Sequence, residues 1–177
     1  ASVLMTAREN GWRPQILAHG AEARESRAHR ELIDWALREG TEGLEVSHAV
    51  LEKLAAKENP QNLMGVFEQR WAALPETKTL AQSALWVALD EIRDPGNLGT
   101  IIRTVDAVGA DGVILVGNCC DPYQREAVRA TMGSLFAVPL VKVERAAFVH
   151  WAKTWPGDRI GTHLDATADF RDGGYKG

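Results

Sequence analysis

Three residues near the middle of the chain, Asn97, Gly99 and Arg103, have the side-chain types and the spacing of a ligand-binding turn. An asparagine at the start of a helix can accept a hydrogen bond from a free backbone N–H, so we expect Asn97 to be the N-cap. Arg103 lies four residues after Gly99 and therefore on the same helix face. Because helical side chains lean toward the N-terminus, its guanidinium should run back over Gly99, where no Cβ obstructs it. Such a cation beside the turn could bind an anion or a polar sugar.

The residues around this triplet predict a strand, a turn and a helix. The apolar run Leu85 to Leu89 is typical of a buried strand, and a helix over 98–108 follows a Pro/Gly turn. This order places the turn at the carboxyl end of a parallel strand, where open α/β sheets bind ligands. The same spacing also fits an ordinary turn of that fold with a solvated arginine, so spacing alone leaves the function open.

The alternation of strands and helices continues to the end of the chain. We expect strands over 112–116, 140–143 and 159–162, and helices over 124–132 and 145–153. Strands separated by helices form parallel sheets with right-handed crossovers. The second half is therefore predicted to be an α/β domain.

The first half predicts a smaller α/β unit. We expect strands over 16–18, 44–46 and 63–67, and helices over 22–38 and 47–57, the second capped by Ser47. Residues 71–84 have no sustained period, which is typical of a linker. The predicted division is therefore a first domain over 1–70, a linker over 71–84 and a second domain over 85–177.

Composition narrows the class of protein. The 177 residues are 45% hydrophobic and 25% charged, as in ordinary soluble domains, and the net charge of −4 gives no global basic signature for nucleic acid. No apolar run approaches the ~18 residues that span a bilayer, so no membrane association is expected. Cys119 and Cys120 are adjacent, which disfavours a disulfide between them and provides no zinc-ligand spacing, so no metal site is expected. A cytoplasmic location is the default expectation.

Three segments of the second half and one of the first half resemble, in the right order, parts of the SpoU (TrmH) family of SPOUT RNA 2'-O-methyltransferases. The first is the N-x-G-x-x-x-R pattern after the P-G turn, and it lies within a longer similar stretch, Ser83 to Gly117. The others are REAVRATMGSLFAVPLVKV, Arg125 to Val143, and IGTHLDATADFRDGGY, Ile160 to Tyr175. The upstream residues are similar to the small RNA-binding domain that many members carry before the catalytic domain.

The resemblance implies a fold of class α/β: a small α/β RNA-binding domain followed by a SPOUT-type parallel-sheet methyltransferase domain of the trefoil-knot family. Relatives continue past the equivalent of Gly177 with G-x-E-x-x-G-like and S-L-N-V-like loops, and they begin with a basic stretch before the equivalent of Ala1. We therefore expect an internal portion of such a protein, incomplete at both ends. The expected missing part includes most of the pocket for the methyl donor.

The resemblance also implies an activity and its residues. It implies transfer of a methyl group from S-adenosylmethionine to a ribose 2'-hydroxyl of RNA, with ribosomal RNA favoured over transfer RNA, by a homodimer. Arg103 and Asn97 would be catalytic, and Thr162, His163 and Leu164 would contact the methyl donor. Gly99, Arg125, Arg129 and Ser134 would lie close to the RNA. Spacing alone puts Arg125 and Arg129 on one helix face, which could equally be a solvated surface.

Two other readings of the sequence remain open. A non-catalytic RNA-binding protein of the same fold would lack the donor-binding loops. A nucleotide-binding domain of the doubly wound type ranks last, because GNLG does not have the spacing of G-x-G-x-x-G and no Walker lysine is present.

Overall fold

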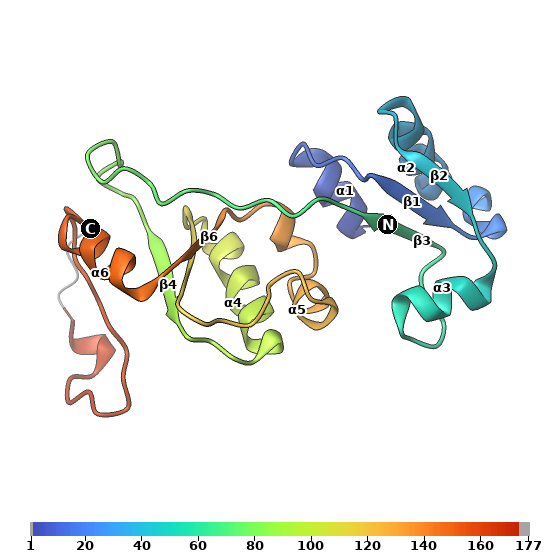
Figure 1. Ribbon diagram of the computed structural model, residues 1–177. Helices are drawn as coiled ribbons and strands as arrows, with labels where there is room; N and C mark the ends of the chain where they lie inside the picture. The colour runs from blue at the N-terminus through green and yellow to red at the C-terminus, as the bar shows by residue number, and fades with distance from the viewer. Residues whose placement is uncertain (1, 174–177) are drawn as a thin grey trace.

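The computed structural model describes residues 2–173, which form two three-stranded sheets, one in each half of the chain (Figure 1). Figure 1 shows them as separate units along an elongated molecule, with the residues between β3 and β4 running from one to the other. None of the helices within residues 2–173 is both long and apolar enough to cross a membrane.

The first sheet has the order β2-β1-β3, with β1 parallel to β2 and antiparallel to β3. Its elements are α1 (Ser2–Glu9), β1 (Ile16–His19), the 3-10 helix η1 (Ala21–Glu25), α2 (Arg27–Arg38), β2 (Glu42–Glu45), α3 (His48–Ala55) and β3 (Leu63–Val66). The single helix predicted over 22–38 is wrong in one respect, because Ser26 has extended backbone angles that separate η1 from α2. Helix α1 was not predicted.

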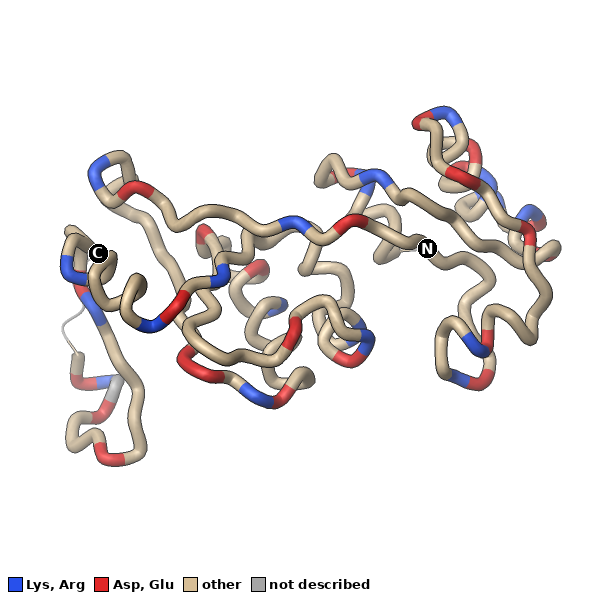
Figure 2. Tube along the Cα trace, viewed as in Figure 1, with Lys and Arg blue, Asp and Glu red and all other residues tan. Residues whose placement is uncertain are grey.

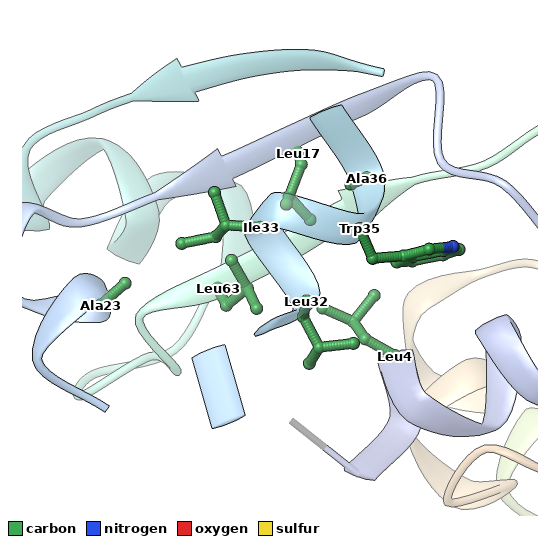
Figure 3. Close-up of a cluster of buried hydrophobic side chains, with 8 residues drawn as sticks. All are labelled: Leu4, Leu17, Ala23, Leu32, Ile33, Trp35, Ala36 and Leu63. Atoms are coloured by element: carbon green, nitrogen blue, oxygen red, sulfur yellow. The ribbon is translucent and has the colours of Figure 1, made fainter. Parts of the chain in front are cut away.

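The core of the first domain lies between α2 and the sheet, as Figure 3 shows. Leu32, Ile33 and Ala36 recur at helical spacing on α2 and are almost completely buried. They pack with Leu17 from β1 and Leu63 from β3. This apolar stripe is what orients α2 on the sheet.

The second sheet is entirely parallel, as the sequence predicted, and its strands have the order β4-β5-β6. Its elements are β4 (Trp86–Asp90), α4 (Pro95–Val108), β5 (Gly112–Val116), α5 (Arg125–Ala130), the 3-10 helix η2 (Ser134–Phe136), β6 (Leu140–Val143), α6 (Arg145–Lys153) and the 3-10 helix η3 (Phe170–Asp172). All five residues of β5 are buried, because helices cover both faces of the central strand.

Alternate residues of β5 face the two different cores. Val113 and Leu115 pack with Leu98 and Ile102 of α4, whereas Ile114 packs on the opposite face in a cluster that includes Phe148 and Trp151 of α6. The sheet therefore fixes where α4 begins, directly beyond the carboxyl end of β4.

The strand predicted over 159–162 is wrong. These residues are exposed and contain no regular structure. The guanidinium of Arg159 donates a hydrogen bond to Ala152 O at 3.1 Å, which ties the segment to the end of α6 instead of to a sheet edge. A strand persists only when its backbone is paired, and this segment has no partner strand in the described part of the chain.

Residues 71–84, predicted to be a linker, pack along the second domain. Ala72 forms a parallel bridge with Val141, and its N–H donates to Leu140 O at 2.8 Å. The indole N–H of Trp151 donates to Pro75 O at 2.8 Å. The beginning of this segment thus extends the second sheet beyond β6.

Candidate functional site

Helix α4 begins at the residue after Asp94. The side-chain Oδ1 of Asp94 accepts a hydrogen bond from the Asn97 backbone N–H at 2.6 Å. The prediction of Asn97 as the N-cap is therefore wrong, and the helix starts three residues earlier than expected. Proline is favoured at the first helical position, where its fixed φ suits the helix and no N–H is needed, so Pro95 places the cap at Asp94.

One face of α4 is polar and exposed. It carries Asn97, Thr100, Arg103 and Thr104. The two threonine hydroxyls donate to carbonyls of their own helix, from Thr100 to Gly96 O at 2.9 Å and from Thr104 to Thr100 O at 3.0 Å. The side chains of Asn97 and Arg103 form no hydrogen bond or ion pair with any residue that the structure describes. An amide and a guanidinium are thus available to a ligand on this face.

Gly99, one turn before Arg103, is buried in the contact between α4 and α5. A Cβ on Gly99 would lie 2.5 Å from the Ala130 Cβ and 2.6 Å from Ala127 O. The space directly over the Gly99 Cα is occupied by α5, so the missing Cβ serves the packing of α4 on α5; the path of the Arg103 guanidinium stays a prediction. Glycine is needed here for close helix packing, and Arg103 extends from the exposed side.

A network of charged residues lies at the carboxyl end of the second sheet. Arg145, which follows β6, forms ion pairs with Asp90 at 2.9 Å and with Glu91 at 3.3 Å. Arg93 pairs with Glu91 at 3.2 Å. Glu91 has a positive φ of 53°, which is unfavourable for a residue with a side chain. The network holds the turn that precedes α4.

Sequence reasoning missed this network. The available signal was that charged residues lie at the carboxyl ends of both strands, with Asp90 as the last residue of β4 and Arg145 shortly after β6. Parallel strands bring their carboxyl ends to one edge of the sheet. The strand order was needed to see that these charges meet across β5.

The two arginines predicted to share a face of α5 have different surroundings. Arg125 is exposed and has no hydrogen bond or ion pair within residues 2–173. The guanidinium of Arg129 instead donates a hydrogen bond to Ala55 O at the end of α3 in the first domain. Ser134, also predicted to lie near RNA, begins η2 and is only 7% exposed.

Thr162, His163 and Leu164 lie in an exposed loop after α6. His163 Nδ1 accepts a hydrogen bond from the Asp165 N–H at 3.2 Å, and the Leu164 side chain is 100% exposed. No hydrogen bond or ion pair within the described residues joins this loop to α4 or α5. The structure thus places Asn97, Gly99 and Arg103 on α4, with Gly99 against α5, and no hydrogen bond or ion pair of the described residues ties the loop to them.

Charges of both signs are scattered over the two halves of the molecule (Figure 2). The chemical content of the site is therefore local: two free polar groups on α4 beside a turn fixed by ion pairs.

Comparison with known proteins gives the same two parts. Residues 84–171 match the SpoU rRNA Methylase family, and residues 1–65 match the MRM3-like substrate binding domain. The chain is 34% identical over 136 residues to a 23S rRNA (uridine(2479)-2'-O)-methyltransferase of Streptomyces viridochromogenes, an alignment that covers 76% of this chain and 46% of that protein. It is 32% identical over 127 residues to the 23S rRNA (guanosine(2553)-2'-O)-methyltransferase RlmP of Bacillus subtilis, covering 72% and 49%.

Two solved methyltransferase structures have the same fold as this chain. An rRNA methyltransferase from Sinorhizobium meliloti, solved with bound AdoMet, superimposes with a TM-score of 0.84 at 36% identity, over 97% of this chain and 63% of that one. The SpoU methyltransferase AviRb from Streptomyces viridochromogenes gives a TM-score of 0.74 at 30% identity, over 86% and 57%.

The chain spans about half the length of the curated relatives it matches. The family matches cover residues 1–65 and 84–171, and the two solved structures superimpose over 97% and 86% of the chain. The chain therefore belongs to the SpoU rRNA Methylase family over residues 84–171, preceded by a match to the MRM3-like substrate binding domain over residues 1–65.

Proposed function

We propose that this chain is part of an enzyme that transfers a methyl group from S-adenosylmethionine to a ribose 2'-hydroxyl of RNA, with ribosomal RNA as the substrate class. The observation that carries the proposal is the pair of unpartnered polar side chains, Asn97 and Arg103, on the exposed face of α4. The relatives named above, which are rRNA 2'-O-methyltransferases, support the substrate class.

Arg103 acts on the ribose. A 2'-hydroxyl is weakly acidic, and it becomes a good nucleophile only as it loses its proton. A guanidinium in a protein stays protonated, so it cannot take that proton. Arg103 instead holds the nucleotide and stabilises negative charge that develops on the 2'-oxygen, while water accepts the proton. Asn97, at the start of the same helix, orients the bound nucleotide through its free amide.

The loop over 162–164 is the proposed contact for the methyl donor. S-adenosylmethionine supplies an electrophilic methyl group on a sulfonium when it is bound. The loop offers such a ligand both polar and apolar groups, because Leu164, which is wholly exposed, follows the polar Thr162 and His163. Burying Leu164 against the donor would remove apolar area from water.

RNA contacts are proposed to be direct for Arg125 and indirect for three other residues. Arg125 is exposed at the start of α5, two residues before Ala127, which packs against Gly99 of α4. Gly99, Arg129 and Ser134 are engaged in packing or in a hydrogen bond to the first domain. We propose that these three hold α4, α5 and η2 in the arrangement that receives RNA.

We also propose that the protein acts as a homodimer. Val108 at the end of α4 and Met132 after α5 are 62% and 63% exposed. Large exposed apolar side chains near one functional region are typical of an interface. Sedimentation velocity at micromolar concentration tests this, and a monomer under conditions that support methyl transfer would contradict it.

The function is tested by methyl transfer from labelled S-adenosylmethionine to ribosomal RNA. A 2'-O-methyl group blocks alkaline cleavage of the adjacent phosphodiester, so we expect the label in alkali-resistant dinucleotides. Label that is released in mononucleotides would place the methyl on a base and overturn the proposal. RNA binding without any calorimetric heat from S-adenosylmethionine would favour the non-catalytic RNA-binding alternative.

A further inference from the structure

We propose that the two domains are locked into one rigid unit by two separate attachments, and that Arg129 is a positioning residue that sets the first domain relative to the α4 site. This inference rests on the proposed function for its catalytic consequence. Its structural part stands on contacts within residues 2–173 alone.

The first attachment is aromatic. Trp12, between α1 and β1 in the first domain, is only 8% exposed, and its indole N–H donates to Phe136 O of η2 at 2.9 Å. The Trp12 and Phe136 rings meet edge to face with centroids 5.1 Å apart, and the Phe67 ring lies 4.9 Å from that of Phe136. Buried aromatic pairs with a satisfied N–H fix orientation as well as distance.

Arg70 closes this attachment from the outside. Its guanidinium carbon lies 4.2 Å from the centroid of the Trp12 ring, and its Nη2 donates to Gly11 O at 3.1 Å. Its backbone N–H donates to the Tyr123 hydroxyl at 3.2 Å, and that hydroxyl donates to Arg70 O. The residue that leads from the first domain to the second is thus bound to both.

The second attachment is Arg129. Its guanidinium donates to Ala55 O, the carbonyl of the last residue of α3. Carbonyls in the last turn of a helix have no partner within the helix, and the helix dipole favours a cation there. Two attachments on different elements, η2 and α5, resist the hinge motion that a single contact would permit.

The contacts connect the first domain to the proposed catalytic face. Arg129 is on α5, and α5 packs against Gly99 of α4 so closely that no Cβ fits between them. Asn97 and Arg103 project from the same α4. RNA held by the first domain is therefore presented to these side chains at a fixed distance. Loss of the Arg129 contact would shift the bound RNA relative to Asn97 and Arg103 without removing a contact between protein and RNA.

This role differs measurably from a phosphate contact. A lysine or arginine bound to phosphate releases a counterion, so its loss weakens RNA binding and lowers the salt slope by about 1. A positioning arginine leaves affinity and salt slope unchanged but lowers turnover. Arg125 provides a matched control, because it is on the same helix and is exposed without a protein partner.

The structural test uses the full chain without substrate. Nitrogen-15 relaxation should give the same rotational correlation time for both domains of the unaltered chain. Arg129→Ala should separate the two values and speed the hydrogen exchange of the Trp12 indole, whose resonance Trp12→Phe identifies. Arg125→Ala should change neither. Independent tumbling of the two domains in the unaltered chain would overturn the proposal, and this readout is independent of methyl transfer.

The kinetic test uses the methyltransferase with ribosomal RNA. We expect Arg129→Ala to lower kcat about tenfold or more, as small misplacements of reactants do, with an unchanged salt slope of RNA binding. Arg129→Lys should restore part of kcat, since an ammonium also donates to Ala55 O. Arg125→Ala should instead weaken binding and lower the salt slope by about 1. A lowered salt slope for Arg129→Ala, or normal kcat, would overturn the positioning role.

Discussion

The carboxylate of Asp94 accepts a hydrogen bond from the backbone N–H of Asn97 at 2.6 Å, and this bond begins the helix that carries Arg103. The exposed side-chain amide of Asn97 therefore does not cap the helix. A residue expected to support the helix is available for a ligand.

Asp94→Ala should lower the free energy of unfolding by about 1 kcal/mol, because the first turn of α4 loses its capping acceptor. Urea denaturation followed by circular dichroism measures the loss. Asp94→Ser keeps an acceptor and is the matched control, with a smaller expected loss. Equal losses for the two variants would show that the cap contributes nothing.

Gly99→Ala should destabilise the second domain by about 1–3 kcal/mol, as overpacking of a close contact does. The added methyl group would meet the Ala130 Cβ and Ala127 O at 2.5 and 2.6 Å. Thermal unfolding measures the effect. Gly161→Ala is the control, since a Cβ there has nothing within 4 Å. A neutral Gly99→Ala would mean that α4 and α5 separate at little cost.

Glu91→Gly should stabilise the protein by up to about 1 kcal/mol in ~1 M salt, because glycine adopts a positive φ without strain and the lost ion pairs are screened there. At low salt, loss of the pairs with Arg93 and Arg145 offsets part of this gain, although exposed pairs are individually weak. Urea midpoints at the two salt concentrations measure the difference. Glu91→Gln keeps the backbone strain and should show no gain at high salt.

Tyr123→Phe should cost about 1 kcal/mol at neutral pH through the lost hydrogen bonds to Arg70. Burial raises the pKa of the Tyr123 phenol above its usual value. Between its unfolded pKa of about 10 and the higher folded value, the folded state binds more protons, so the stability contributed by Tyr123 falls as pH rises above about 10. Tyr123→Phe should therefore lose stability less steeply in that alkaline window. Parallel curves for the two proteins would contradict the assignment.

Arg103→Lys should lower kcat of methyl transfer by about 10²-fold or more, because an ammonium does not reproduce the planar, two-pronged donation of a guanidinium. The stability of the fold should be unchanged, since the side chain is exposed and without a partner in residues 2–173. Single-turnover assays separate this loss from RNA binding. Near-normal turnover would show that two-pronged geometry is unnecessary.

The second sheet could be predicted from the sequence because its strands are unambiguous. The run 112–116 is wholly apolar and lies between helical patterns, which is the signature of a central parallel strand. The start of α4 was harder, since Asp94 and Asn97 are both good caps and only the position of Pro95 separates them. The segment 159–162 has one large apolar residue, Ile160. One such residue does not identify a neighbouring strand with which the segment would pair.

Contacts between the halves could not be predicted. Trp12 and Phe136 are separated by 124 positions, and no local pattern links an indole to a distant carbonyl. The same holds for Arg129. Its spacing from Arg125 indicated a shared helix face, but nothing in the sequence indicated its hydrogen bond to the Ala55 carbonyl. The residue assignments for RNA and donor binding, and the division at residues 70 and 84, stay predictions.

The pairing of Ala72 with Val141 has a consequence for protein engineering. A domain is most easily exchanged for another when the chain that connects it to the next domain packs against neither of them. Here the stretch just after the first module borders β6, and Leu74 shields part of the apolar cluster that contains Val141. A chimera joined after residue 84 would uncover that cluster, whereas one joined before Trp71 would keep its native cover.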